Sequence, residues 1–226
     1  MWISHLCIGL QPGPTSCYYV HRRISTRQNM SIEGPAGKLE IQVDDAPQAE
    51  NITAILCHPH PQYGGSMHDA VVGTATEVLL DHGIGCVRFN FRGVGGSEGR
   101  FDNGVGEVED LLSVVDWQRQ TNPEHSLWLA GYSFGSNIVW RSLDRANPAF
   151  ALLIAPPVGM MDYSGEKTDV PVAAIAGDRD DFVDAAKFKE WLGDQAYLIE
   201  GADHFFGGYH RNLADLVAQI VAAQLS

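Results

Sequence analysis

The chain has 226 residues, of which 45% are hydrophobic and 24 are glycines, a composition that suits one compact α/β domain with a sizeable core. Its formal net charge is −13 and it has no Lys/Arg cluster, which argues against nucleic acid and anionic membrane surfaces as partners. No apolar run approaches the roughly 18 residues of a membrane span, so we expect a soluble protein.

The first 29 residues differ from the rest of the chain. They contain Pro12, Gly13 and Pro14 and show no sustained period of two or 3.6 residues. We expect a poorly ordered extension over residues 1–29 and one folded domain over residues 30–226. Met30 and the four residues after it resemble the start of a protein, which predicts that translation begins at Met30.

Periodicity places the regular elements along the remaining chain. Apolar or alternating runs predict strands at 39–43, 53–57, 86–91, 127–130, 150–155, 170–176 and 197–199, the first of them at a sheet edge. Helical spacing of apolar residues predicts helices around 71–79, 108–115, 136–140, 185–191 and 213–221. Strands separated by helices predict a doubly wound, mostly parallel sheet flanked by helices, whose ligands bind beyond the carboxyl ends of the strands.

A G-x-S-x-G pattern links the strand at 127–130 to the helix that follows. In Gly131-Tyr132-Ser133-Phe134-Gly135 the glycines permit a turn so tight that a side chain there would collide with a neighbouring strand or helix. The turn lifts the Ser133 hydroxyl clear of the sheet, and the unpartnered N–H of Phe134 at the helix start can face an oxyanion. The competing interpretation is that the glycines serve only a tight turn.

A serine nucleophile needs a base and an orienting acid. His204 directly follows the last strand and is the best placed of nine histidines. Asp178, Asp180 and Asp181 follow the preceding strand, and the chain order of serine, acid and histidine allows each of them. We choose Asp180 because the loop must travel past the strand end to reach the imidazole, and we interpret Asp178 as stabilising the loop and Asp181 as an N-cap or a solvated residue.

The second oxyanion donor should come from the loop after the strand at 53–57. Pro59 and Pro61 have no N–H, whereas His60 lies between them and has one. We therefore choose His60, with Gly64 and Gly65 as the alternative donors.

Five motifs in this order and spacing are GYSFG, HPHPQYGGSMHDAVV, FNFRGVGGSEG, AGDRDD and GADHFF. Together they resemble the α/β-hydrolase superfamily, and within it the small bacterial hydrolases with HPHP-x-x-GG that are related to the serine aminopeptidase and dienelactone hydrolase groups. The resemblance runs from about residue 36 to the C-terminus. It implies a nucleophile at Ser133, an acid at Asp180 and a base at His204, with backbone donors at Phe134 and near His60.

Two departures limit what the resemblance implies. Dienelactone hydrolases use a cysteine nucleophile, which this elbow lacks, so their substrate is not carried over. Only residues 156–169 are available for a lid, so we expect an open site with a minimal lid or none. We assign substrate binding to Tyr132, Met160, Met161 and Tyr163.

The sequence thus predicts a serine hydrolase that cleaves an ester or thioester of a small acyl substrate without a cofactor. The alternatives are a peptidase of the serine aminopeptidase type and a non-catalytic binding protein of the same fold. His58-x-His60 also has the spacing of a metal-binding pair, which serves zinc amidohydrolases built on larger barrels with several further ligands. This chain is short for such a barrel and offers a serine nucleophile instead, so we predict no metal. Oligomeric state is left open.

The remaining polar motifs are interpreted structurally. The four cysteines lack C-x-x-C spacing, which predicts buried thiols and a reducing cytoplasm. Arg92 and the glycines after it lack the pattern of a phosphate-binding loop and are interpreted as a structural turn. Glu107 and Asp110 are interpreted as part of a solvated helix face.

Overall fold

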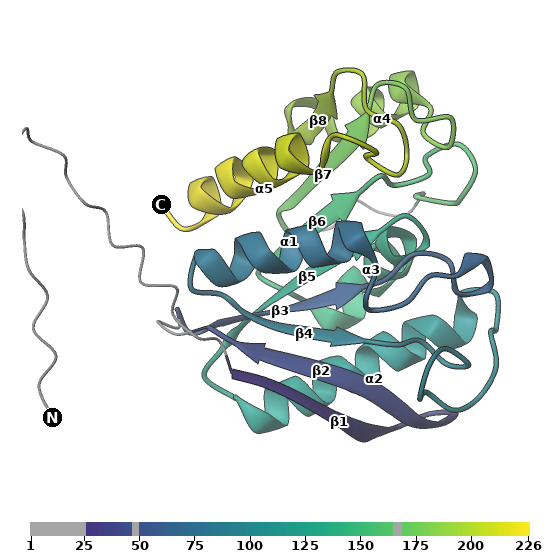
Figure 1. Ribbon diagram of the computed structural model, residues 1–226, viewed down its shortest axis with the longest axis vertical. Helices are drawn as coiled ribbons and strands as arrows, with labels where there is room; N and C mark the ends of the chain where they lie inside the picture. The colour runs from purple at the N-terminus through teal and green to yellow at the C-terminus, as the bar shows by residue number, and fades with distance from the viewer. Residues whose placement is uncertain (1–25, 47–49, 165–168) are drawn as a thin grey trace, which may run out of the picture.

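The computed structural model describes residues 26–46, 50–164 and 169–226 (Figure 1). Eight strands form one sheet in the order β1-β2-β4-β3-β5-β6-β7-β8. They are β1 (Thr26–Gly34), β2 (Gly37–Asp45), β3 (Ile52–Cys57), β4 (Gly85–Phe89), β5 (Ser126–Tyr132), β6 (Phe150–Ile154), β7 (Val172–Gly177) and β8 (Ala196–Ile199). The β1–β2 and β2–β4 pairs are antiparallel and all the other pairs are parallel.

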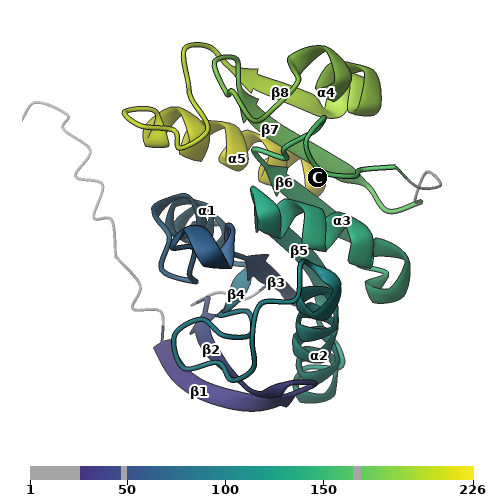
Figure 2. The same cartoon turned by 90° about the vertical axis from the view of Figure 1, so that its right-hand side faces the viewer.

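Helices cover both faces of the sheet, as Figure 2 shows in side view. They are α1 (Ala70–Asp81), α2 (Val105–Thr121), α3 (Phe134–Ala146), α4 (Ala185–Leu192) and α5 (His210–Gln224). One core layer packs α1 and α5 against the sheet, and the other packs α2, α3 and α4 against its opposite face. Strands β5 to β7 are almost wholly apolar because both of their faces are buried. These features confirm the predicted fold class.

The predicted elements recur with one main difference, at the sheet edge. The strand predicted at 39–43 is β2, which is not an edge strand, because β1 pairs with it from Thr26 to Gly34. Residues 26–29, which we assigned to the extension, therefore belong to the sheet. Residues 1–25 lie outside the described residues, and the start at Met30, which lies within β1, stays a prediction.

The carboxyl ends of the parallel strands meet at one edge of the sheet. The loops after β3, β4, β5, β7 and β8 therefore gather there, although they are far apart in the sequence. Among the described helices none is long and apolar enough to cross a membrane.

Candidate active site

The turn between β5 and α3 consists of Ser133 alone. Its φ of 53° and ψ of −119° are strained for a residue with a side chain, a feature that clusters at functional sites. A Cβ on Gly131 would overlap the Gly135 carbonyl, and one on Gly135 would overlap the carbonyls of Cys57 and His58. Both glycines are therefore required, for the steric reason that the sequence indicates.

Three side chains from three strand ends form a continuous hydrogen-bonded chain. Nε2 of His204 lies 2.9 Å from Oγ of Ser133, and Nδ1 of His204 lies 2.8 Å from Oδ2 of Asp180. Asp180 and His204 are each only 6% exposed. Because a carboxylate only accepts, Nδ1 carries the proton and Nε2 is free to accept the Ser133 hydroxyl. The structure thus brings together the predicted nucleophile, base and acid.

The other two carboxylates in the loop after β7 have different surroundings. Asp178 accepts a hydrogen bond of 2.6 Å from the Gly201 N–H and so ties this loop to the one after β8. Asp181 is exposed, and the N-cap of α4 is Asp184 instead. Asp180 also accepts the Phe182 N–H at 2.8 Å, which orients its carboxylate toward His204.

Tyr132 supports the loop that carries His204. Its hydroxyl donates to the His204 carbonyl at 3.0 Å, and its side chain is only 3% exposed. Burial raises the pKa of this phenol, so it stays a donor. The sequence does not reveal this partner 72 residues away, and the assignment of Tyr132 to substrate binding stays a prediction.

His60, in the loop after β3, packs against the residue that follows Ser133. Its ring contacts the Phe134 ring at 5.0 Å between centroids and the Phe101 ring at 4.9 Å, so the loop after β3 packs on the elbow. Its carbonyl accepts the Gly65 N–H at 3.1 Å, which removes Gly65 as an oxyanion donor. Burial lowers the pKa of His60, and the nearby Glu107 partly opposes that shift.

His58 anchors this loop through both of its ring nitrogens. Its Nδ1 donates to the Pro59 carbonyl at 2.6 Å, and its Nε2 accepts the Phe91 N–H at 3.0 Å. Burial lowers its pKa to about 4, so the ring is neutral at pH 7. Both nitrogens are occupied, and the described residues contain no cluster of three or more His, Cys, Asp or Glu that could hold an ion.

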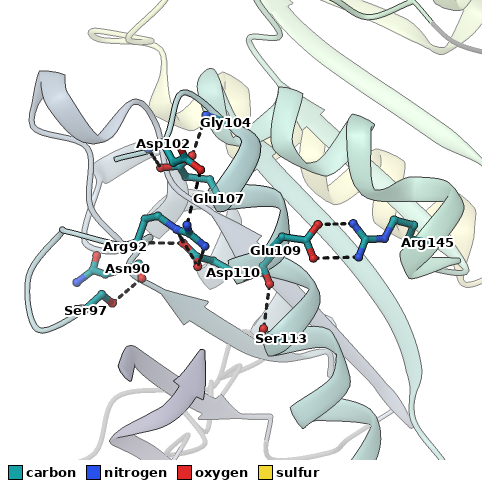
Figure 3. Close-up of polar contacts among 10 residues, drawn as sticks. All are labelled: Asn90, Arg92, Ser97, Asp102, Gly104, Glu107, Glu109, Asp110, Ser113 and Arg145. Atoms are coloured by element: carbon teal, nitrogen blue, oxygen red, sulfur yellow. Dashed lines mark hydrogen bonds and ion pairs between the residues drawn. The ribbon is translucent and has the colours of Figure 1, made fainter. Parts of the chain in front are cut away.

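A buried ionic cluster, drawn in Figure 3, fixes the loop from Arg92 to Gly104. This loop contains Phe101, whose ring contacts that of His60. Arg92 makes a two-pronged ion pair with Asp110 at 2.7–3.1 Å. Glu107 accepts the N–H groups of Asp102 and Gly104 at 2.8 and 2.7 Å.

Glu107 and Asp110 are fully buried, so the prediction that they form a solvated face is wrong. Charges inside a protein are tolerated when they are paired, and their partners here lie outside helix α2. The interpretation of Arg92 as part of a structural turn agrees with these contacts.

The loop after β6 contains the other predicted wall residues. Met160 is 67% exposed and Met161 is half-buried. Tyr163 is buried, and its hydroxyl lies 2.7 Å from Oγ of Ser136, which itself donates to the Ser133 carbonyl. Tyr163 therefore supports the elbow through Ser136, and it also lines a hollow together with Met161, so the assignment of these residues to substrate binding stays a prediction.

Two phenylalanines beside the triad were missed by the sequence analysis. Between ring centroids, Phe182 lies 4.5 Å from His204 and Phe205 lies 5.4 Å from His204. The available signal was their apolar character in otherwise polar loops, directly beside the predicted acid and base.

A mostly parallel sheet with a strained serine at a strand-to-helix elbow defines an enzyme class, the hydrolases of the α/β type. Known proteins agree with this class. A family model described as alpha/beta hydrolase fold matches residues 60–155. A solved α/β serine hydrolase without lid from Xanthomonas campestris is 38% identical, with a TM-score of 0.81 over 87% of this chain and 94% of that one.

Two further proteins extend the match. A solved alpha-beta serine hydrolase homologue from Coxiella burnetii is 36% identical, with a TM-score of 0.82 over 87% of this chain and 98% of that one. An uncharacterised protein of Rickettsia prowazekii is 38% identical over 191 residues, which are 77% of this chain and 80% of that protein. The chain belongs to the α/β-hydrolase superfamily, and its fold supports a hydrolase.

Proposed function

We propose that the protein is a serine hydrolase that cleaves an ester or thioester bond of a small acyl substrate. The observation that carries the proposal is the hydrogen-bonded chain from Asp180 through His204 to Ser133 at a strained elbow. The solved relatives at 36–38% identity, which are described as serine hydrolases, support the same reaction class.

In this mechanism Ser133 attacks the acyl carbonyl while His204 takes the hydroxyl proton and Asp180 stabilises the resulting imidazolium. The N–H groups of Phe134 and His60 are the donors that we assign to the oxyanion. Phe134 begins α3, where N–H groups have no intrahelical acceptor, and His60 packs against it. Water activated by His204 then cleaves the acyl-enzyme, so the protein's own residues suffice for every step.

The first test is labelling with a fluorophosphonate, followed by peptide mass spectrometry. We expect an adduct on Ser133 that disappears in Ser133→Ala and in His204→Ala, because only a serine activated by its base reacts. Ser113→Ala is the matched control, since its hydroxyl bonds the Glu109 carbonyl on α2, and it should label like the parent protein.

Absence of labelling in folded parent protein would overturn the proposal and favour a non-catalytic binding protein. Parent enzyme that has not been exposed to the probe is then assayed on ester, thioester and peptide substrates that share one acyl group. Faster turnover of the peptide would favour a peptidase of the serine aminopeptidase type.

We also propose that residues 26–226 form one catalytic domain and that it acts in the cytoplasm. Cys57 and Cys86 are free and buried in the core, where burial raises their pKa values. Cell fractionation with an antibody against the protein tests the location, and recovery of the protein outside the cytoplasm would contradict it.

A further inference from the structure

An exposed aromatic corner lies beside the base of the triad. Phe182 follows β7 and Phe205 follows β8, and their rings contact each other edge to face at 6.5 Å between centroids. Both rings also contact His204, at 4.5 and 5.4 Å. The three rings therefore form one cluster at the carboxyl edge of the sheet.

The exposure of these two rings is unusual within this chain. All nine phenylalanines lie in the described part of the chain, and Phe182 and Phe205 are its two exposed ones, at 40% and 63%. Single exposed apolar side chains are ordinary on a protein surface. Here both gather on one imidazole, which indicates an apolar binding surface at that place.

The geometry of the proposed reaction indicates which part of a substrate lies beside His204 and the two phenylalanines. During acylation the Ser133 Oγ–carbon bond forms and the bond from that carbon to the leaving oxygen or sulfur breaks. The proton taken from Ser133 by Nε2 of His204 passes to the leaving atom. The leaving group must therefore lie beside His204, whereas the carbonyl oxygen faces the donors on the side of Phe134.

We propose that Phe182 and Phe205 form a leaving-group subsite that selects esters or thioesters of an apolar, uncharged alcohol or thiol. This inference rests on the proposed function and names the substrate class of the same site. An exposed carboxylate lies close to each phenylalanine in the chain: Asp181 directly precedes Phe182, and Asp203 lies two residues before Phe205. The nearest cation in sequence, Arg179, lines a separate hollow with Glu200 and Asp215, so anionic leaving groups should be disfavoured.

The test compares benzyl and ethyl esters of butyric acid, which yield the same acyl-enzyme. We expect the parent protein to prefer the benzyl ester and to discriminate against its 4-carboxybenzyl analogue. Phe182→Ala and Phe205→Ala should each lower kcat/KM for the benzyl ester about tenfold, the size expected when a ring contact is lost. For the ethyl ester the loss should stay below about twofold.

Deacylation separates this role from a structural one. The leaving group has departed by that step, so the rate of acyl-enzyme hydrolysis after a burst should be unchanged in both variants. Leu225→Ala, which removes an exposed apolar side chain at the end of α5, is the matched control and should change none of these values. Phe182→Leu and Phe205→Leu, which keep apolar bulk, should recover part of the benzyl preference.

Equal losses for the two esters, or slower deacylation, would show that the rings only position His204 and would overturn the subsite. Fluorophosphonate labelling of each variant keeps the two proposals distinct. Labelled variants with an unchanged benzyl-to-ethyl ratio overturn the subsite alone, whereas an unlabelled parent protein overturns the serine mechanism and the subsite with it.

Discussion

Two loops at the carboxyl edge of the sheet each carry a buried histidine, yet the two residues do opposite things. His58, after β3, donates to the Pro59 carbonyl and accepts the Phe91 N–H. His204, after β8, bonds the Asp180 carboxylate and the Ser133 hydroxyl. Backbone groups hold a ring but do not exchange its proton, whereas a carboxylate and a hydroxyl let the ring take a proton and return it. The chemical nature of the partners, and not burial, therefore separates an anchor from a base.

The largest expected effect is the loss of activity on substitution of His204. His204→Gln should lower kcat/KM by about 1,000- to 10,000-fold, because it removes the proposed base while the elbow and the proposed oxyanion donors remain. The Tyr132 bond should persist because it is made to the His204 backbone. Kinetics on an activated ester measure the loss of kcat/KM, and urea unfolding measures the stability of the variant. A loss of stability large enough to unfold the variant would contradict the assigned role, because unfolding alone would then explain the lost activity.

A smaller expected effect is the pH dependence of the unfolding free energy that His58 causes. The folded-state pKa of His58 is about 4, against 6.5 when unfolded, so below pH 6.5 the unfolded chain binds more protons. Its stabilising contribution is complete above pH 6.5 and is lost as the pH falls toward 4. This contribution amounts to about 3 kcal/mol of unfolding free energy.

Urea unfolding from pH 7 to pH 4 checks this dependence. His58→Gln can still accept the Phe91 N–H but cannot titrate, so its unfolding free energy should fall less steeply than that of the parent protein. At pH 7 the variant should be about 1–3 kcal/mol less stable, since the other hydrogen bond is disturbed. Identical slopes for the two proteins would show that His58 does not cause the acid sensitivity.

The smallest expected effect is on kcat, from a substitution that weakens the support of the His204 loop but leaves the Ser133, His204 and Asp180 side chains in place. Tyr132→Phe removes the hydroxyl that donates to the His204 carbonyl, at a cost of about 1 kcal/mol in stability. We expect kcat to fall about 3- to 10-fold with little change in KM, because the imidazole is less well positioned. An unchanged kcat would mean that Asp180 and the neighbouring rings suffice to hold His204.

Much of this architecture could be predicted from local patterns. Apolar periodicity placed most helices and strands, because a buried face must recur with the period of its element. The elbow glycines indicated Ser133, since the steric conflict that Gly131 avoids is with Gly135, four residues further along the chain. The conflict that Gly135 avoids is with the end of β3 and depends on the fold. His204 followed from its place after the last strand, because parallel strands bring their carboxyl ends to one edge.

Other roles could not be predicted because they depend on partners distant in sequence. Three aspartates fitted the chain order, and only the folded loops show Asp180 on His204 and Asp178 on Gly201. In the sequence, Glu107 and Asp110 resemble solvated residues. In the structure, the loop after β4 covers them and supplies their partners Gly104 and Arg92.

The sequence by itself therefore determined the fold class and named the serine, the histidine and a short list of acids, because periodicity, turn sterics and chain order are local properties. Only the tertiary structure showed the backbone partners of His58, the burial of Glu107 and Asp110, and the supporting contacts of Tyr132 and Tyr163. It also placed Phe182 and Phe205 beside His204. The physical reason is that a polar group's role depends on which group it meets, and these meetings join loops and helices that are far apart along the chain.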